Sequence, residues 1–325
     1  MRKIIKIQDS NPKLLKIYYD LGNLCNYSCW YCFPDSHSGT DPWPDPEVVK
    51  KNIVSLVEYY YNTKLVNDIE IHFLGGEPTL WKHLGSVIEY IKQNVKCRLN
   101  ILTNASRTLR WWDEYGHYFD NVGISVHHER ADIKHIISVS EILYKKNISF
   151  YTNVLMDHKE WTKCIGIVNE LTSTNTKWPV LVKPIHINGV SEYEDWQKPY
   201  LETQLKRKPT LLNFIRHFQI PKNKITMTFD NGEKDTTRNP NYFMLNMMNK
   251  FEGWKCNLGI NYLYIDRKGT ISGTCKQKLY GLDYYHNIND IDFAEKFTPA
   301  IEPVICEQKI CMCSGEAALT KTKIS

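Results

Sequence analysis

Eight residues, Cys25-Asn26-Tyr27-Ser28-Cys29-Trp30-Tyr31-Cys32, carry three cysteines in the spacing CxxxCxxC and follow an apolar, strand-like stretch. Three thiolates at this spacing can hold three corners of a four-iron cluster, and the motif supplies no fourth ligand. One iron would then be open to a substrate or cofactor. The alternative is a structural zinc site in which His37 completes a Cys3His set.

A second motif, Gly75-Gly76-Glu77-Pro78, follows the strand-like stretch at residues 69–74. The order of the two motifs, each after a strand, resembles the radical S-adenosylmethionine (radical SAM) superfamily. This resemblance implies a [4Fe–4S] cluster on Cys25, Cys29 and Cys32, which binds S-adenosylmethionine at its open iron. It also implies reductive cleavage of that cofactor to a 5′-deoxyadenosyl radical, with a flavodoxin- or ferredoxin-type protein as electron donor.

The same resemblance predicts the residues that contact S-adenosylmethionine. Gly75 and Gly76 have no side chain to keep a ligand from the backbone, and Glu77 can accept a hydrogen bond from an ammonium group. Tyr31 corresponds to an aromatic position that helps to seat the adenine, and Ser125 to a polar position that contacts the methionine or ribose part. Two further polar residues close predicted strands and are added as candidates: Thr103 and Asn153.

Strand and helix patterns alternate along the first 190 residues and predict an α/β fold. A helix is expected to begin at Asp45-Pro46-Glu47, because Asp caps helices and Pro suits the first helical position. Six strand–helix units of this kind form a parallel sheet with helices outside. The resemblance implies that the sheet is a partial (β/α)6 TIM-like barrel, with the active site at the C-terminal strand ends. The expected strands after the first motif are residues 69–74, 98–103, 122–126, 148–155 and 180–187, and the first is 15–21.

Half of the ten cysteines follow residue 250. Residues 261–266 and 270–274 predict a β-hairpin with a cysteine at each end, which would bring Cys256 and Cys275 to one metal centre. The tail supplies three more, and the arrangement resembles the Twitch form of the SPASM domain, which binds an auxiliary [4Fe–4S] cluster. Five thiols are available for the four ligand positions of such a cluster. The expected ligands are Cys256, Cys275, Cys306 and one of the pair Cys311 and Cys313. Structural zinc is again the alternative.

These patterns divide the chain into three parts. Residues 1–190 are expected to form the radical SAM core, 191–253 a linker or substrate-specificity region, and 254–325 the Twitch-like auxiliary domain. The middle region is rich in aromatic and basic side chains, which suits either a linker that packs the two domains together or a nucleotide-binding surface. These side chains include Trp196, Phe214, Arg216, His217, Phe218 and Lys222, ahead of a turn at Asp230-Asn231-Gly232.

Composition adds few limits on partners. The chain has 41 basic and 36 acidic residues, and no long block of like charge predicts a nucleic-acid-binding tail. No secretory signal or membrane-spanning stretch is evident, so we expect a cytoplasmic protein without a membrane partner. Ten cysteines in such a protein favour metal or redox chemistry over disulfides.

Three functions fit these observations. The first is a radical SAM oxidoreductase or isomerase that abstracts hydrogen from a peptide or small molecule. The second is a radical SAM enzyme that rearranges or oxidises a nucleotide or nucleic-acid base, for instance in hypermodified phage DNA. The third, a non-enzymatic zinc or iron–sulfur protein, is disfavoured by the Gly-Gly-Glu-Pro motif. Only about 14 residues precede the first expected strand, which weakens the peptide hypothesis because a leader-binding domain would need more.

Overall fold

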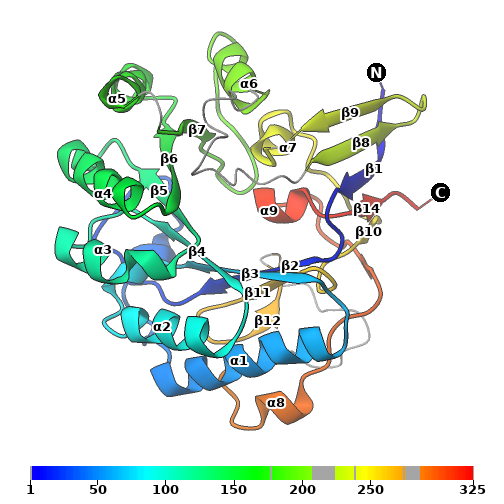
Figure 1. Ribbon diagram of the computed structural model, residues 1–325. Helices are drawn as coiled ribbons and strands as arrows, with labels where there is room; N and C mark the ends of the chain where they lie inside the picture. The colour runs from blue at the N-terminus through cyan, green and yellow to red at the C-terminus, as the bar shows by residue number, and fades with distance from the viewer. Residues whose placement is uncertain are drawn as a thin grey trace.

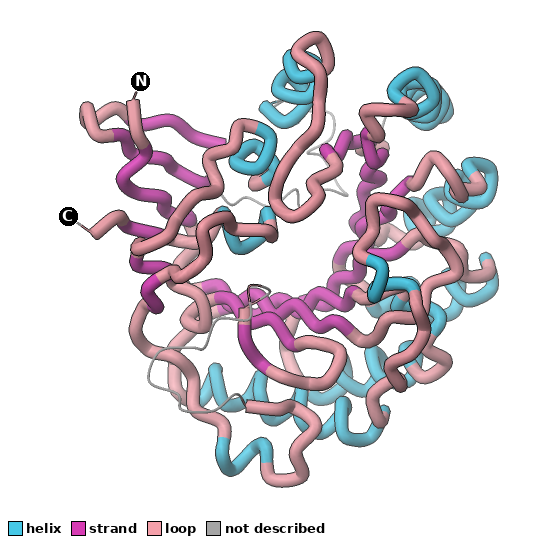
Figure 2. Tube along the Cα trace, turned by 180° about the vertical axis from the view of Figure 1, so that it is seen from behind, coloured by secondary structure: helices cyan, strands magenta, loops and turns pink. Residues whose placement is uncertain are grey.

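The computed structural model describes residues 2–175, 178–206, 224–237, 239–273, 275 and 286–324. Its main sheet has the strand order β12-β11-β2-β3-β4-β5-β6-β7 and curls around an inner face, with helices on the outside (Figures 1 and 2). The strands β2 to β7 are parallel neighbours in chain order, so the predicted α/β class and the order of six strand–helix units are confirmed. Their bounds are β2 Leu14–Asp20, β3 Asp68–Leu74, β4 Arg98–Thr103, β5 Asn121–Val126, β6 Ser149–Met156 and β7 Val180–Pro184.

A helix follows each of these strands, and its apolar face covers the outside of the sheet. The helix α1 begins after Asp45, whose Oδ1 accepts hydrogen bonds from the N–H groups of Glu47 and Val48, so the predicted cap is confirmed. Because side chains alternate along a strand, every second residue is buried against the helices and the others line the inner face. The helices are α1 Pro46–Asn62, α2 Leu84–Asn94, α3 Leu109–Tyr115, α4 Ile133–Lys145, α5 Trp161–Thr174 and α6 Lys198–Lys206, with short helices α7 Asn241–Leu245, α8 Phe293–Lys296 and α9 Ser314–Ala317 later in the chain.

The predicted hairpin near the C-terminus is present, as β11 (Tyr262–Ile265) and β12 (Ile271–Ser272). Its place was not expected, because β11 pairs in parallel with β2 and extends the main sheet. The turn between them carries Gly269 at φ +86°, a conformation that side chains other than glycine rarely adopt. The segment assigned to a separate auxiliary domain therefore shares a sheet with the core.

A second, antiparallel sheet joins distant parts of the chain. Its order is β13-β10-β14-β1-β8-β9, and β1 pairs with both β14 and β8. The hairpin predicted at Asp230-Asn231-Gly232 connects β8 and β9, whereas β1 was not predicted. Phe214, Arg216, His217, Phe218 and Lys222 lie outside the described residues. The bounds are β1 Ile4–Asp9, β8 Ile225–Phe229, β9 Lys234–Thr237, β10 Lys255–Cys256, β13 Val304–Ile305 and β14 Lys321–Thr322.

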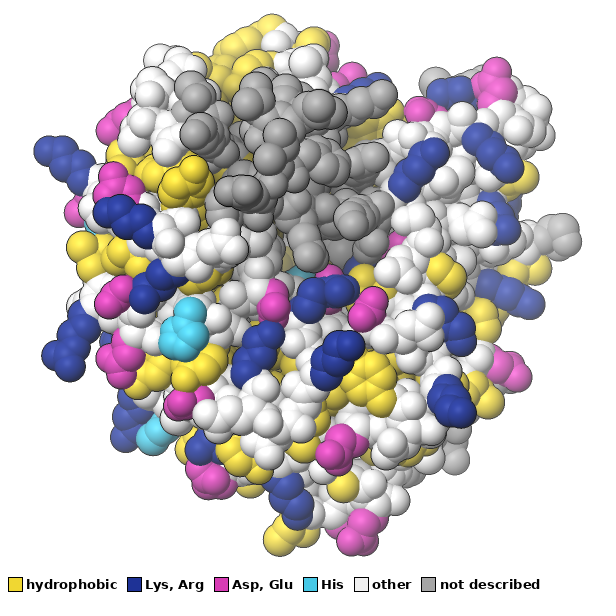
Figure 3. All heavy atoms as spheres, in the orientation of Figure 1, with side chains coloured by type: hydrophobic (Ala, Val, Ile, Leu, Met, Phe, Trp, Pro, Cys, Tyr) yellow, Lys and Arg dark blue, Asp and Glu magenta, His cyan; other side chains and the backbone are white. Residues whose placement is uncertain are grey.

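Basic and acidic side chains are interspersed over the face shown in Figure 3, as the small excess of positive charge suggests. None of the helices in the described part of the chain combines the length and the apolar character that a membrane crossing requires.

Candidate active site

The cysteine motif forms the loop between β2 and α1, and its three thiols lie together. The thiols of Cys25 and Cys32 are close enough for each to perturb the pKa of Cys29, and Cys32 likewise perturbs that of Cys25. Burial raises the pKa of Cys25 to about 11 and that of Cys29 to about 12. The loop is held compact by its own backbone, since the N–H of Cys32 donates to the carbonyl of Cys29 at 3.0 Å. Three thiols on one loop, without a fourth in the motif, suit three ligands of an iron–sulfur cluster.

His127, at the end of β5, contacts this loop directly. Its Nδ1 lies 2.9 Å from the hydroxyl of Tyr31 and 3.4 Å from Sγ of Cys29, and its ring stacks on Tyr31 at 5.8 Å. Burial and the nearby charge of Lys183 lower the pKa of His127 to about 4, so its imidazole is neutral at neutral pH. Tyr31 therefore lies beside the thiols, with its hydroxyl hydrogen-bonded to the histidine, and its role in seating the adenine stays a prediction. The sequence marked His127 only as a polar residue at a strand end.

Asp157, which follows β6, anchors the same loop from the other side. Its Oδ2 accepts a hydrogen bond of 2.7 Å from the indole N–H of Trp30, and the ammonium of Lys159 lies 4.3 Å from the centre of a Trp30 ring. The Nε2 of His128 is 3.7 Å from the same carboxylate oxygen. Sequence reasoning missed Asp157, whose only signal was a carboxylate directly after a strand.

Glu77 accepts four hydrogen bonds from within the protein. Its carboxylate accepts hydrogen bonds from the N–H and hydroxyl of Thr79, the hydroxyl of Thr103 and the N–H of Asn104, at 2.6–3.1 Å. A carboxylate offers about four acceptor positions. Only 1% of Glu77 is exposed, and burial raises its pKa against these hydrogen bonds, which lower it. Three of these donors bind Oε1 and one binds Oε2, and those from Thr103 and Asn104 tie the Gly-Gly-Glu-Pro loop to the end of β4. The hydrogen bond from a cofactor ammonium to Glu77 stays a prediction.

The two glycines of that loop pack against the cysteine loop. A Cβ on Gly76 would lie 2.4 Å from the carbonyl oxygen of Leu24, and one on Gly75 2.6 Å from that of Gly22. Glycine is thus required at these two positions because the two backbone segments approach each other too closely for a Cβ atom. The carbonyl oxygens of Gly75 and Gly76 accept no hydrogen bond from the described residues, so they are available to a donor on a ligand.

Ser125 and Asn153 are register partners on β5 and β6. Both side chains are partly exposed, and neither makes a hydrogen bond within the part of the chain that the structure describes. They lie on the same face of the sheet as Tyr151, at the C-terminal ends of their strands. Thr103, in contrast, points to the opposite face, where it is buried against Glu77.

Four of the five C-terminal cysteines line one small cavity. Its volume is about 20 Å³, and the thiols are those of Cys256, Cys275, Cys306 and Cys311. Cys313 is not among its lining residues, and its Sγ lies 3.9 Å from the hydroxyl of Tyr262. The cavity therefore leaves Cys313 outside the group of four thiols. Among the described residues, no three His, Cys, Asp or Glu side chains are placed to hold a single metal ion.

Lys321 also borders this cavity, although it is only 2% exposed. Its ammonium donates to the backbone carbonyl of Glu316 and lies 5.0 Å from the centre of the Phe251 ring. Burial lowers its pKa, but the thiols of Cys256 and Cys311 and the carboxylate of Glu316 outweigh this effect, so the pKa of Lys321 is raised. A fixed positive charge thus faces the four thiols.

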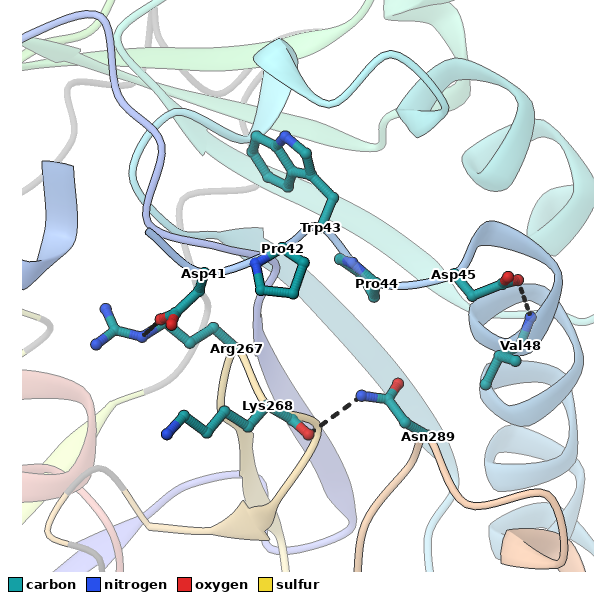
Figure 4. A pocket seen from close by; sticks show the side chains of 9 residues that line it. All are labelled: Asp41, Pro42, Trp43, Pro44, Asp45, Val48, Arg267, Lys268 and Asn289. Atoms are coloured by element: carbon teal, nitrogen blue, oxygen red, sulfur yellow. Dashed lines mark hydrogen bonds and ion pairs between the residues drawn. The ribbon is translucent and has the colours of Figure 1, made fainter. Parts of the chain in front are cut away.

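A larger pocket lies elsewhere, between the segment that follows the cysteine loop and the turn of the β11–β12 hairpin (Figure 4). Its volume is about 440 Å³. Arg267 forms an ion pair with Asp41 there, and its guanidinium also donates to the backbone carbonyl of Asp35. The hairpin turn therefore holds the segment that follows the cysteine loop in place.

Comparison with known proteins agrees with these motifs. Residues 19–157 match the family described as the Radical SAM superfamily. The S-adenosylmethionine-dependent nucleotide dehydratase of Fibrobacter sp. is 24% identical over 246 residues, which cover 67% of this chain and 72% of that protein. The GTP 3′,8-cyclase of Psychromonas ingrahamii is 24% identical over 232 residues, or 70% of this chain and 57% of that protein.

Solved structures share the fold. Native anSMEcpe with bound AdoMet and Kp18Cys peptide superposes with a TM-score of 0.54 and 14% identity, over 87% of this chain and 80% of that one. A histidine-tagged form of anSMEcpe with bound AdoMet gives a TM-score of 0.53 and 14% identity, over 88% and 78% of the two chains.

Proposed function

We propose, from the radical SAM superfamily domain that residues 19–157 form, that this protein is a radical SAM enzyme and that its substrate is a nucleotide. The observation that carries the enzyme class is the gathering of the Cys25, Cys29 and Cys32 thiols on one loop, next to polar strand ends. The substrate class is supported by the curated relatives, which are by name a nucleotide dehydratase and a GTP cyclase. These relatives favour the nucleotide hypothesis over the peptide or small-molecule hypothesis.

The three thiols would hold a [4Fe–4S] cluster that, when reduced by a flavodoxin- or ferredoxin-type donor, supplies the electron that breaks the C5′–S bond of S-adenosylmethionine. The chain's own groups would position that cofactor. The free carbonyls of Gly75 and Gly76 suit its ammonium group, together with Oε2 of Glu77, which accepts one hydrogen bond from the protein. Ser125 and Asn153 present uncommitted polar atoms on the inner face, and Tyr31 offers a ring beside the thiols.

An auxiliary [4Fe–4S] cluster would be bound by Cys256, Cys275, Cys306 and Cys311. The donor set is that of a fully ligated cluster, and the positive charge of Lys321 offsets part of the negative charge of four thiolates. A cavity of about 20 Å³ holds little more than a water molecule, so the thiols would move apart when the cluster binds. Residues 254–325 would then act as a Twitch-like domain that is continuous with the core of residues 1–190, and residues 191–253 as the specificity region.

The test is anaerobic reconstitution with iron and sulfide, followed by incubation with S-adenosylmethionine, a reductant and each of GTP, CTP, UTP and ATP. We expect one nucleotide to accelerate 5′-deoxyadenosine formation, as quantified by mass spectrometry. With that nucleotide deuterated on the ribose or base, deuterium should appear in 5′-deoxyadenosine. Acceleration by peptides but by none of the nucleotides would overturn the nucleotide assignment, and absence of cleavage under every condition would overturn the enzyme class.

A further inference from the structure

The inner face of the main sheet carries three basic side chains on its described strands: Lys16 on β2, Arg98 on β4 and Lys183 on β7. Two of them are neutralised by carboxylates. Lys16 pairs with Asp9 at 3.1 Å and Arg98 with Glu70 at 2.9 Å. Lys183 makes neither a hydrogen bond nor an ion pair with any residue that the structure describes, although it is partly buried.

Lys183 is the register partner of Leu155, at the C-terminal ends of β7 and β6. The thiols of Cys313 and Cys32 perturb its pKa, and its charge in turn helps to lower the pKa of both His127 and His186 to about 4. None of the described carboxylates is among the groups that perturb Lys183. Lys183 is partly buried, and this burial lowers its pKa, because an ammonium is less stable when it is partly removed from water. An ammonium in such a place is stabilised when an anion pairs with it.

We propose that Lys183 binds an anionic group of the substrate, which is a phosphate if the substrate is the nucleotide of the proposed function. Lys183 follows Leu181, the register partner of Asn153, by two residues on the same face of the sheet. The candidate cofactor contacts Ser125 and Asn153 lie on the neighbouring strands β5 and β6. A phosphate held by Lys183 would thus bring the rest of the substrate next to the cofactor, with the thiol of Cys313 beside it.

The first test measures binding to the reconstituted enzyme by equilibrium dialysis, with tripolyphosphate, GTP, CTP and citrate as probes. The variants are Lys183→Met, which removes the charge, Lys183→Arg, which keeps it, and Lys163→Met, an exposed lysine on α5 that serves as the control. We expect Lys183→Met to weaken binding of tripolyphosphate and of at least one nucleotide by tenfold or more. The other two variants should stay within about twofold of the wild type, and S-adenosylmethionine binding should be unchanged in all.

The second test uses Cys313 as a reporter of the same site. Iodoacetamide labelling of Cys313, followed by peptide mass spectrometry, should be slowed by tripolyphosphate in the wild type but not in Lys183→Met. Loss of S-adenosylmethionine affinity in Lys183→Met would overturn the inference, because the lysine would then serve the cofactor. Unchanged binding of every probe would also overturn it. If only citrate binding depended on Lys183, the anion site would stand and the nucleotide assignment would fail.

Discussion

The hydroxyl of Thr103 donates a hydrogen bond of 2.7 Å to Oε1 of Glu77, and this contact joins the end of β4 to the loop after β3. Both residues are almost fully buried. A buried carboxylate depends on each of its donors, because every lost hydrogen bond leaves charge without compensation. The loop that packs on the cysteine motif is therefore fixed by charge-assisted hydrogen bonds at its base.

Thr103→Val should lower the free energy of unfolding by about 1.5–3 kcal/mol, the usual cost of a lost hydrogen bond to a charged group. Urea unfolding measures the loss. Thr152→Val is the matched control, because the hydroxyl of Thr152 donates to the neutral carbonyl of Pro179 at 3.2 Å. That variant should lose only about 1 kcal/mol. Equal losses in the two variants would argue against the charged acceptor.

Simultaneous replacement of Cys25, Cys29 and Cys32 by Ala should abolish formation of 5′-deoxyadenosine, because these thiols hold the proposed cofactor-binding cluster. The C-terminal thiols are untouched, so about half of the iron should remain, that is, four of eight atoms. Iron analysis and mass spectrometry after anaerobic reconstitution provide both readouts. Residual cleavage in this variant would mean that the assignment of the motif is wrong.

Cys311→Ser and Cys313→Ser should behave differently, since only Cys311 lines the cavity shared with Cys256, Cys275 and Cys306. Cys311→Ser should lower the iron bound by the auxiliary site, whereas Cys313→Ser should retain the full amount. Mössbauer spectroscopy distinguishes the two clusters. A loss of iron in Cys313→Ser equal to that in Cys311→Ser would contradict the ligand set.

Gly76→Ala should destabilise the fold by about 1–3 kcal/mol, because the new Cβ overpacks a tight backbone contact. That Cβ would meet the carbonyl oxygen of Leu24 at 2.4 Å. Gly166→Ala is the control, since a Cβ there has nothing within 4 Å, and alanine in a helix should add about 0.5–1 kcal/mol. Thermal unfolding of the two variants should therefore shift in opposite directions.

Arg98→Met should destabilise the protein in a pH-dependent way. Burial raises the pKa of Glu70, but His72, Arg98 and Lys16 together lower it to about 2. Because the folded pKa is below the unfolded value, this stabilisation is complete above about pH 4.5 and is lost as the pH falls toward 2. We expect a deficit of about 1 kcal/mol at pH 7, which corresponds to a folded pKa of Glu70 that is higher by about 0.7 in the variant, so the deficit should shrink only as the pH falls below about 3, as measured by urea unfolding. A deficit that stays constant from pH 7 down to about pH 2 would exclude this linkage.

Local patterns predicted the core of the fold well. The strand at residues 98–103 was found with its predicted bounds, and α1 begins at its predicted cap. Periodicity and capping act within a few residues, so the sequence displays them directly. The positions of β1 and β11 were not foreseen, because strand pairing across more than two hundred residues leaves no local signal.

The sequence predicted the motifs of the candidate site but not the residues that hold those motifs in place. The cysteine loop and the glycines follow from short motifs, whereas two of the hydrogen bonds to Glu77 come from Thr103 and Asn104, which reach it only in the folded sheet. In the sequence, nothing distinguished Lys183 from the other residues of its predicted strand. Lys183 became a candidate because none of the residues that the structure describes forms a hydrogen bond or ion pair with it, and only a structure can show this.

The pairing of β11 with β2 also affects how the chain is made. β2 is synthesised early, but its neighbour at residues 262–265 follows β7 by about 80 residues, or roughly 4–16 s of translation. During that interval the new sheet presents an open edge beside the cysteine loop, and such an edge invites pairing with other chains. Chaperone protection of the nascent protein would therefore matter most before residue 265 leaves the ribosome, and a fragment that ends after β7 should aggregate.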